Sequence, residues 1–233
     1  MPTLLCIETA TAVCSVALVR QGRVAGLLET NTTNSHAAKV AVFIDELIRE
    51  HLNSASGLDA VVVSSGPGSY TGLRIGVSTA KGLCYALDVP LIAIETPLSM
   101  AYGMKMIAVS PQKLPLIYAP MIDARRMEVY TALYNPEMET IKAVNAQIIQ
   151  QDTFDDLIHD HQIILAGDGA AKCKELLNHP NFIYLDEFRN SAAHMAEAAT
   201  RRFEQQQFED VAYFEPFYLK DFIAGKPRVK GLD

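Results

Sequence analysis

The sequence predicts an α/β fold of two lobes, in which each lobe is a mixed β-sheet flanked by helices. Three strand-like runs joined by short hairpins open the chain, and strands then alternate with helices up to residue 108. Antiparallel strands followed by alternating strands and helices give a mixed sheet with helices on its faces. The second half repeats this pattern of strands and helices less clearly. A chain of 233 residues is long enough for two modest lobes. We therefore assign residues 1–108 to an N-terminal lobe and 109–233 to a C-terminal lobe.

The N-terminal elements follow from their residue types. Strands are expected at 3–9, 14–20 and 23–30, with a two-residue turn at 21–22. Ser35 suits the N-cap of a helix over 36–52. The run 60–65 lacks alternation, which indicates a strand buried on both faces. The elements expected after it are a glycine-rich turn at 66–72, a helix at 73–87, a strand at 90–94 and a helix at 96–108.

The C-terminal half carries weaker signals of the same kind. Strands are predicted at 115–122, 127–134 and 162–166, and helices near 152–159, 170–178 and 191–207. Asp123-Ala124-Arg125-Arg126 follows the first of these strands. Its carboxylate and guanidinium groups either pair with each other or form the rim of a ligand site. Gly167-Asp168-Gly169 is a strand-to-helix turn that fits either a nucleotide edge or plain turn geometry.

Charge and composition exclude several classes of protein. A net charge of -7 argues against a protein that grips nucleic acid by itself, although Lys226, Arg228 and Lys230 form a short basic tail. The four cysteines have neither zinc-knuckle nor redox-pair spacing, which indicates free thiols in a reducing compartment. The N-terminus has no secretory pattern, and no apolar run approaches the ~20 residues of a membrane helix. We expect a cytoplasmic protein with no membrane association.

The glycine-rich turn at 66–72 is the first candidate binding site. Backbone amides in such a turn, with a helix N-terminus behind them, favour an anion. The spacing matches neither the Walker nor the dinucleotide pattern, so a structural tight turn explains it equally well. Glu8 and Thr9 end the first strand, where they would meet a metal-bound phosphate or simply be polar strand-end residues. The residues of this predicted nucleotide edge are Glu8, Thr9, Gly66, Gly68 and Ser69.

Other catalytic signals are weaker still. His159-Asp160-His161 resembles a metal-ligand cluster but lies at a helix-to-strand junction without a third ligand, so we read it as a solvated turn. No serine has the Gly-x-Ser-x-Gly environment of a hydrolase nucleophile.

The two helices predicted at 36–52 and 73–87, on either side of the glycine-rich turn at 66–72, carry more apolar surface than one sheet face can cover. Residues 40–44 are five consecutive apolar residues, which cover every direction around a helical turn. Between 73 and 87 only Arg74, Ser78, Thr79 and Lys81 are polar. A helix that is apolar all round is either deep in a core or covered by another chain. We favour a partner chain, with burial under the second lobe as the alternative.

Five segments of the chain carry a resemblance to a known family, and the longest of them is the most specific. They are the opening LLCIETAT, the block 64–101, IDARRMEVY at 122–130, AGDG at 166–169 and EPFYL at 215–219. In these segments the chain resembles the TsaB (YeaZ) family over essentially its whole length. The resemblance implies an actin-like ATPase (ASKHA, ribonuclease H-like) fold.

The resemblance also bears on catalysis. TsaB proteins are paralogues of TsaD, the metal- and nucleotide-binding enzyme that transfers a threonylcarbamoyl group to an adenosine beside the tRNA anticodon. In TsaD the stretch that matches 95–101 holds two metal-binding histidines, whereas this chain has none there. Glu8 also replaces the usual aspartate. The resemblance therefore implies a degenerate, non-catalytic paralogue with no metal and no cofactor of its own, with ATP or ADP an option at the interface of the complex.

The resemblance finally implies a set of partners. TsaB proteins pair with TsaD, or with themselves, through the two N-lobe helices. We expect a scaffold subunit that binds and activates a TsaD-like transferase, helps to recruit a TsaE-like ATPase and touches tRNA only within the complex. When alone it is either a homodimer or a monomer. The alternatives are a metallopeptidase (glycoprotease-like) or ATPase of the same fold, and a nucleotide sensor that uses 66–72. The expected interface residues are Val40, Phe43, Ile44, Leu47, Leu73, Val77 and Leu83, with Gly76 and Ala80 permitting close approach.

Overall fold

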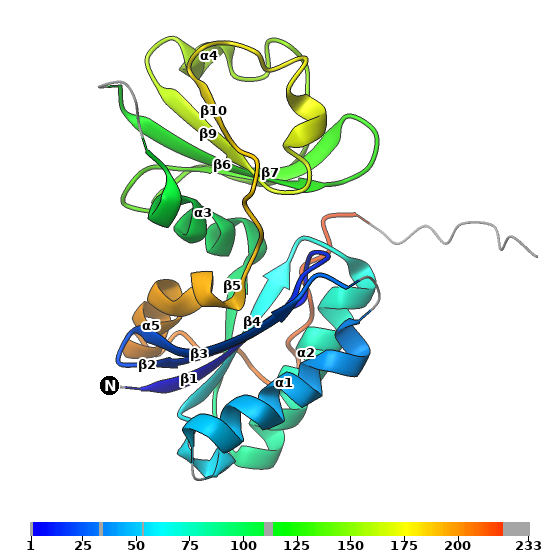
Figure 1. The fold of residues 1–233 in the computed structure, drawn as a ribbon, viewed down its shortest axis with the longest axis vertical. Coiled ribbons are helices and arrows are strands. Elements are labelled where there is room, and N and C mark those ends of the chain that lie inside the picture. The colour runs from blue at the N-terminus through cyan, green and yellow to red at the C-terminus, as the bar shows by residue number, and fades with distance from the viewer. Residues whose placement is uncertain (1, 33–34, 53, 110–113, 221–233) are drawn as a thin grey trace, which may run out of the picture.

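Two five-stranded sheets organise the protein (Figure 1). The computed structural model describes residues 2–32, 35–52, 54–109 and 114–220. The strand order is β3-β2-β1-β4-β5 in one sheet and β10-β9-β6-β7-β8 in the other. Read from β8, the second sheet repeats the order of the first, with the same antiparallel and parallel partners. The predicted two-lobed ASKHA, ribonuclease H-like fold of mixed sheets is confirmed.

The first sheet matches its sequence prediction closely. Its antiparallel strands are β1 (Thr3–Glu8), β2 (Cys14–Arg20) and β3 (Arg23–Thr30). Strands β4 (Ala60–Gly66) and β5 (Leu91–Glu95) extend it in parallel. Every residue of β4 is buried, as the lack of alternation in that run predicts.

Helices α1 (His36–His51) and α2 (Tyr70–Leu87) cover one face of this sheet. A short 3-10 turn, η1 (Ala55–Gly57), leads from α1 towards β4. Alternate strand residues such as Leu5, Ile7 and Val16 point to the helices and share one apolar cluster with them. The buried residues of the core under α1 and α2 therefore all come from the first lobe, and the partly buried Val211 and Phe214 of the C-terminal segment pack against them.

The second lobe is built in the same way from shorter pieces. Its strands are β6 (Leu116–Asp123), β7 (Glu128–Tyr134), β8 (Thr140–Ile148), β9 (Gln162–Ala166) and β10 (Phe182–Leu185). The outer face of this sheet is covered by a single helical turn, α4 (Asp155–Ile158), and a 3-10 turn, η2 (Ala171–Cys173).

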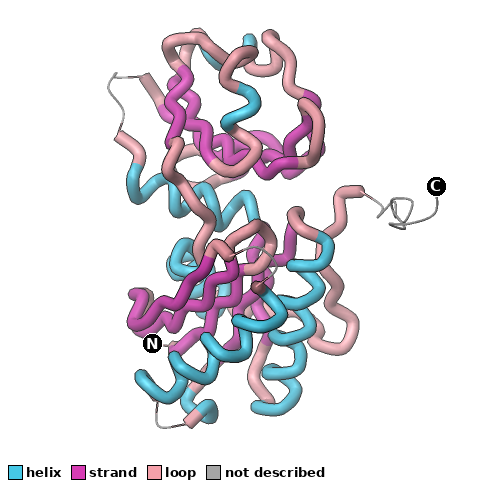
Figure 2. Tube along the Cα trace, turned by 45° about the vertical axis from the view of Figure 1, so that its right-hand side comes forward, coloured by secondary structure: helices cyan, strands magenta, loops and turns pink. Residues whose placement is uncertain are grey.

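A shared apolar layer lies between the two sheets (Figures 1 and 2). It is formed by α3 (Thr96–Ile107), the 3-10 turn η3 (Ala192–Met195) and α5 (Ala196–Glu204). Helix α3 packs on β6 and β7 of the second lobe, whereas η3 and α5 pack on the first sheet. The chain passes from the first sheet to the second through α3 and returns through the segment before η3, in which Phe188 belongs to the shared core and Asp186, Glu187 and Arg189 are exposed.

The structure corrects several predicted elements. The helix expected at 170–178 is only the turn η2, that expected at 152–159 is the single turn α4, and that at 191–207 begins as η3. Strands β8 and β10 were not predicted from the sequence. The two sheets lie on either side of residue 108, whereas α5 packs on the first sheet, and the domain division at 108 stays a prediction. Within the described residues, no helix has the length and apolar character needed to cross a membrane.

Candidate functional site

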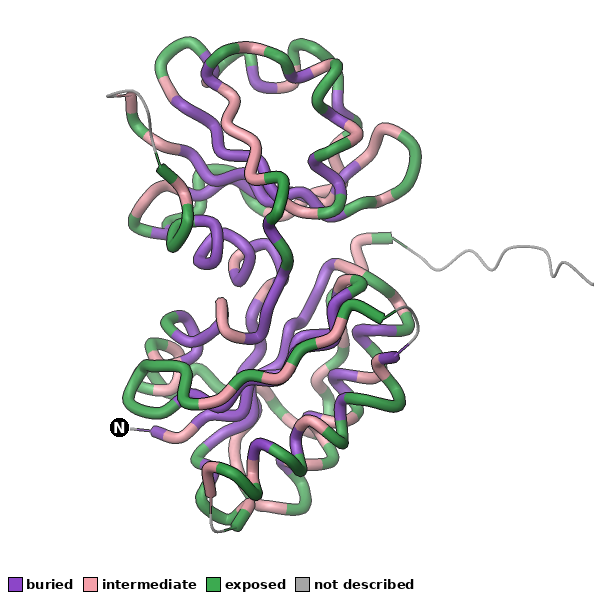
Figure 3. The backbone as a smooth tube through the Cα atoms, in the orientation of Figure 1, coloured by how far each residue is buried: buried purple, intermediate pink, exposed green. Residues whose placement is uncertain are grey.

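The outward face of the α1–α2 pair is the first candidate site. The two helices pack against each other and against the sheet, and buried and exposed residues alternate along them (Figure 3). Six of the nine predicted interface residues are at most 5% exposed and face the sheet. They are Val40, Ile44, Leu47, Leu73, Val77 and Ala80, and Gly76 is buried with them. Their prediction as contact residues is corrected by this packing, because no partner chain reaches side chains enclosed by their own lobe.

The exposed residues of these helices are different ones. Phe43 and Leu83 are half-buried, Val42 is 52% exposed and Tyr85 is 88% exposed. No atom lies within 4 Å of where a Cβ on Gly82 would be, so that position opens outward. We call the following residues the outer helix face: Ala38, Ala41 and Val42 of α1, and Ser78, Gly82 and Tyr85 of α2. Their three- and four-residue spacing places them in one stripe on each helix.

The outer helix face combines small residues with one large exposed aromatic ring. Small side chains let another backbone approach closely, and an exposed tyrosine is the kind of residue that anchors protein interfaces. Burial of the whole helix pair under the second lobe, the alternative from the sequence, is excluded because these residues are exposed. That a partner binds there stays a prediction.

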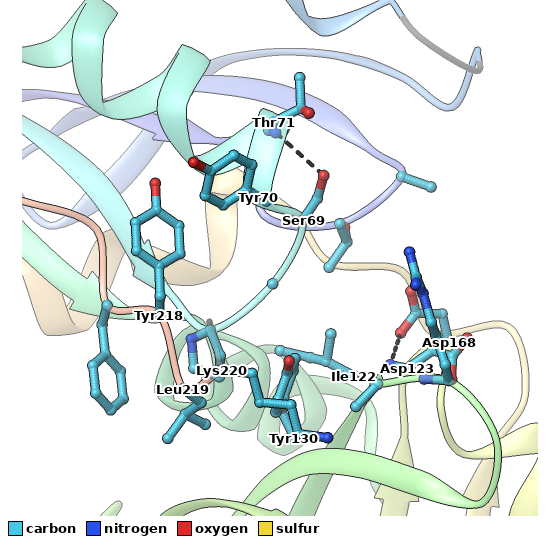
Figure 4. A pocket seen from close by; sticks show the side chains of 18 of the residues that line it. Ser69, Tyr70, Thr71, Ile122, Asp123, Tyr130, Asp168, Tyr218, Leu219 and Lys220 are labelled. Atoms are coloured by element: carbon cyan, nitrogen blue, oxygen red, sulfur yellow. Dashed lines mark hydrogen bonds between the residues drawn. The ribbon is translucent and has the colours of Figure 1, made fainter. Parts of the chain in front are cut away.

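A cleft of about 970 Å³ between the lobes is the second candidate site. Its first-lobe wall is the connection after β1 and the turn at 67–72, and its second-lobe wall is 122–126 with Asp168 (Figure 4). The C-terminal segment 217–220 forms a third wall. Gly68 and Ser69 of the predicted nucleotide edge line the cleft, whereas Glu8, Thr9 and Gly66 are buried behind it.

The glycines of the turn are explained by close packing within the first lobe. A Cβ on Gly72 would lie 2.0 Å from the Thr9 carbonyl oxygen. Ser69 N–H donates to Ala10 O (2.7 Å), and Gly72 N–H donates to Ser69 Oγ (3.2 Å), which caps α2. The amides of Ser69 and Gly72 therefore already have acceptors, and the turn differs from a phosphate cradle whose amides all point outward. Nucleotide binding at this edge stays a prediction.

The C-terminal segment 217–220 ties the two lobes together. Phe217 N–H donates to Ser65 O (2.7 Å), and the Phe217 carbonyl oxygen lies 2.6 Å from where a Cβ on Gly66, with φ +110°, would be. The rings of Tyr218 and Tyr70 lie 5.0 Å apart, and Lys220 pairs with Glu128 of the second lobe. Sequence reasoning missed this strap, since a short segment without periodicity gives no secondary-structure signal.

The second-lobe wall resolves the alternatives for the segment 123–126. Asp123 pairs with Lys172 and accepts from Arg125 N–H (3.0 Å), while its own N–H donates to Asp168 Oδ1 (2.9 Å). Burial raises the pKa of Asp168. The guanidinium groups of Arg125 and Arg126 have no ion-pair partner within the described residues, and both side chains are exposed at the cleft. The carboxylate therefore pairs with a lysine, and the arginines form a rim.

Glu8 is fully buried at the end of β1. Its Oε1 accepts from Ala10 N–H (2.6 Å) and Ser64 Oγ (2.9 Å), whereas Oε2 has no hydrogen-bond partner among the residues that the structure describes. Burial raises the pKa of the carboxyl to about 7, against the opposing effect of these donors and of the nearby Asn190. A carboxyl that holds its proton near neutral pH and has no contact with the cleft is suited to the core rather than to phosphate chemistry.

The stretch 95–101 and the turn His159-Asp160-His161, for neither of which a metal is expected, lie in different parts of the fold. Residues 95–101 begin α3, where Thr96, Ser99, Met100 and Ala101 are buried. His161 Nδ1 contacts Leu157 O (3.1 Å), whereas the His159 ring packs edge-on against His179. Over the described ranges, no three histidine, cysteine or acidic side chains gather closely enough to hold a metal ion.

Comparison with known proteins places this fold and these segments in context. The family model described as "TsaD: tRNA N6-adenosine threonylcarbamoyltransferase" matches residues 20–226. The chain is 27% identical over 231 residues to the tRNA threonylcarbamoyladenosine biosynthesis protein TsaB of Escherichia coli (strain K12), covering 96% of each. It is 33% identical over 132 residues to TsaB of Bacillus subtilis (strain 168), covering 57% of this chain and 55% of that one.

A solved structure shares the whole architecture. YeaZ from Pseudomonas aeruginosa superposes with a TM-score of 0.80 at 25% identity, over 94% of this chain and 100% of that one. The shared fold extends through both lobes, so the similarity is not confined to one sheet.

Proposed function

The chain belongs to the TsaD (tRNA N6-adenosine threonylcarbamoyltransferase) family, within its TsaB (YeaZ) branch, and from this premise we propose that it is a non-catalytic partner subunit in the synthesis of threonylcarbamoyladenosine in tRNA. Its TsaB relatives are named as biosynthesis proteins of that modification. The partner that we propose is a TsaD-like transferase, which the chain binds and activates in the cytoplasm.

The outer helix face is the observation that carries this proposal. It keeps Val42 and Tyr85 exposed beside small residues on α1 and α2, while the larger aliphatic side chains of both helices are used by the core. A pair of adjacent helices can pack against the same pair of a second copy or against the helix pair of another protein, which gives a four-helix contact. Stable complexes bury on the order of 1,600 Å² in total, and such a contact can supply this area. A paralogue with the same fold presents a comparable helix pair, so a heterodimer and a homodimer compete for one surface.

The proposal also includes an ATPase and tRNA as further members of the complex. A TsaE-like ATPase would join the paired subunits, and tRNA would bind the complex, since a chain of net charge -7 lacks the basic surface for RNA of its own. The basic residues Lys226, Arg228 and Lys230 lie outside the described residues. ATP or ADP at the complex interface belongs to this proposal.

Two features of the chain support the non-catalytic role. Glu8 holds a raised pKa in the core, and the stretch 95–101 supplies no histidine. The alternatives of a metallopeptidase or an ATPase are tested by elemental analysis and ATP turnover of the purified chain. One equivalent of tightly bound zinc or iron, or sustained ATP hydrolysis by the chain alone, contradicts the proposal.

Co-expression with the TsaD-like transferase of the same cell tests the partner directly. We expect the two chains to copurify as a heteromer, and tRNA modification by the reconstituted proteins to depend on adding this chain. Val42→Asp places a charge on the outer helix face and should weaken copurification without unfolding the chain. Modification at the full rate in the absence of this chain would show that it is not the activating subunit.

A further inference from the structure

The surface next to the outer helix face is the feature that the proposed partner contact leaves open. Of the six residues of that face, only Val42 and Tyr85 have large side chains. A standard interface buries about 800 Å² on each partner and uses about 20–30 residues a side. A contact of that size therefore extends beyond the outer helix face onto the elements beside it.

The C-terminal segment 208–215 lies directly beside α2. The Lys81 ammonium, on α2, donates to Ala212 O (3.2 Å) and to Phe214 O (2.9 Å). Lys81 precedes Tyr85 by about one helical turn, so the segment adjoins the outer helix face along its α2 edge. Because α1 packs against α2, the two helices and this segment stand side by side on the first lobe.

The inner side of this segment is fixed to the first lobe. Glu209 N–H donates to Leu91 O (2.9 Å), and Val211 and Phe214 pack against the core under α1 and α2. Tyr213 lies between these two anchored positions and is 84% exposed. A ring that a fixed backbone already presents to solvent loses little conformational freedom when a partner binds, and tyrosine is among the residues that most often anchor interfaces.

The segment also carries charge that the first lobe does not neutralise. Residues 203–219 include four acidic residues and no lysine or arginine. Asp210 and Glu215 are exposed, and neither forms an ion pair with another described residue. On this side of α2, the Lys81 ammonium is bound to two carbonyl oxygens, and the Arg74 guanidinium lies over an aromatic ring. An exposed tyrosine is thus flanked in the chain by two carboxylates without a cation.

We propose that the segment 208–215 is part of the transferase-binding surface and that the partner presents lysine or arginine side chains to it. Tyr213 is a second aromatic anchor beside Tyr85. The Asp210 and Glu215 carboxylates pair with the partner's cations, which also suit the face of the tyrosine ring. A second copy of this chain, with a net charge of -7, is a poorer match for an acidic surface. These contacts rest on the proposed function and add to it the charge of the partner's surface.

Calorimetric titration of the full chain with the TsaD-like transferase tests these contacts. Tyr213→Ala should weaken binding about tenfold or more, as loss of an interface anchor does. Asp210→Asn/Glu215→Gln removes two charges, and the amide oxygen at 210 keeps the acceptor for Ala212 N–H. This variant should bind about threefold to tenfold more weakly at ~50 mM salt and within about twofold of the wild type at ~300 mM salt, where the charges are screened.

Asp152→Asn/Asp156→Asn is the charge-matched control. It removes two exposed carboxylates from the second lobe and should change affinity less than about twofold at either salt concentration. If Tyr213→Ala and the acidic-segment variant bind as tightly as this control while Val42→Asp weakens binding, the segment lies outside the interface and the proposed function stands. If Val42→Asp also binds as tightly as the control, the proposed function fails together with these contacts.

Sedimentation equilibrium of the chain without the transferase separates a second copy from the transferase as the occupant. Weaker self-association of Tyr213→Ala, together with an unchanged affinity for the transferase, would assign the segment to a second copy and overturn the proposal.

Discussion

The rings of Tyr70 and Tyr218 lie 5.0 Å apart at an interplanar angle of 41°, and they join the first residue of α2 to the C-terminal strap. The Arg74 guanidinium lies over the Tyr70 ring, 4.2 Å from its centre. Phe217 and Lys220 fix the strap on either side of this contact. The strap is therefore held by a ring contact, a backbone hydrogen bond and an ion pair in succession.

We expect the ring contact to outweigh the ion pair. Tyr218→Ala should lower the free energy of unfolding by about 1–2 kcal/mol, because it removes an aromatic pair and its buried area. Lys220→Ala should lower it by less than about 1 kcal/mol, because the Lys220 side chain is 45% exposed and solvent screens the pair. Urea unfolding of both variants measures the difference. Equal losses would show that the strap is held mainly by charge.

Two glycines of α2 should respond in opposite directions to the same substitution. Gly72→Ala should destabilise the chain by about 2–3 kcal/mol, because the added Cβ would lie 2.0 Å from a backbone oxygen that cannot move alone. Gly82→Ala should stabilise it by about 0.5–1 kcal/mol, because the space there is open and alanine favours the helix. Thermal unfolding of the pair checks both signs. Stabilisation by Gly72→Ala would contradict the packing of α2 on the β1–β2 connection.

The buried Glu8 carboxyl should make stability depend on pH. Its pKa is about 7 in the folded chain, against 4.5 as the ordinary value, so the folded state holds the proton over that interval. The unfolded state releases the proton first, and the free energy of unfolding should therefore fall as pH rises from about 4.5 to about 7. The fall attributable to Glu8 is on the order of 3 kcal/mol, at ~1.4 kcal/mol per pH unit.

Glu8→Gln isolates this effect, since glutamine keeps the acceptor for Ala10 N–H and Ser64 Oγ and does not titrate. The stability of this variant relative to the wild type should increase between pH 5 and pH 8, as measured by urea unfolding at each pH. A difference that is constant across this range would mean that Glu8 is ionised throughout.

The first lobe was predicted almost completely because its signals are local. The structure of three segments can be read from their own residues. They are the hairpin turn at 21–22, the non-alternating run of β4 and the glycine-rich turn before α2. Strand β8 was missed because it is an edge strand in which five of nine residues are exposed and the apolar residues do not alternate strictly with polar ones. Strand β10 has only four residues, which is too short for a period to be recognised.

The interface residues show where pattern reasoning fails. Val40, Ile44 and Leu47 are spaced as one helical stripe, and so are Leu73, Val77 and Ala80. That spacing predicts the sheet-facing side, and the most apolar residues were nevertheless assigned to a partner. The outward surface of the two helices carries smaller residues and Tyr85, which hydrophobicity alone does not select.

The interlobe cleft is lined by residues from 11 to 220. Only the tertiary fold brings them together, so the sequence could not predict it.

The affinity of the chain for the TsaD-like transferase, measured for two matched double variants, tests the partner role most directly. Val42→Asp/Tyr85→Ala alters the outer helix face, and Ile141→Asp/Met106→Ala adds a charge and removes a large side chain at residues of β8 and α3 that are 48% and 75% exposed. We expect the first variant to weaken binding about 30-fold or more, as loss of an interface anchor does, and the second less than about twofold. Equal affinity of both variants and the wild type would contradict the assignment of the outer helix face to the partner.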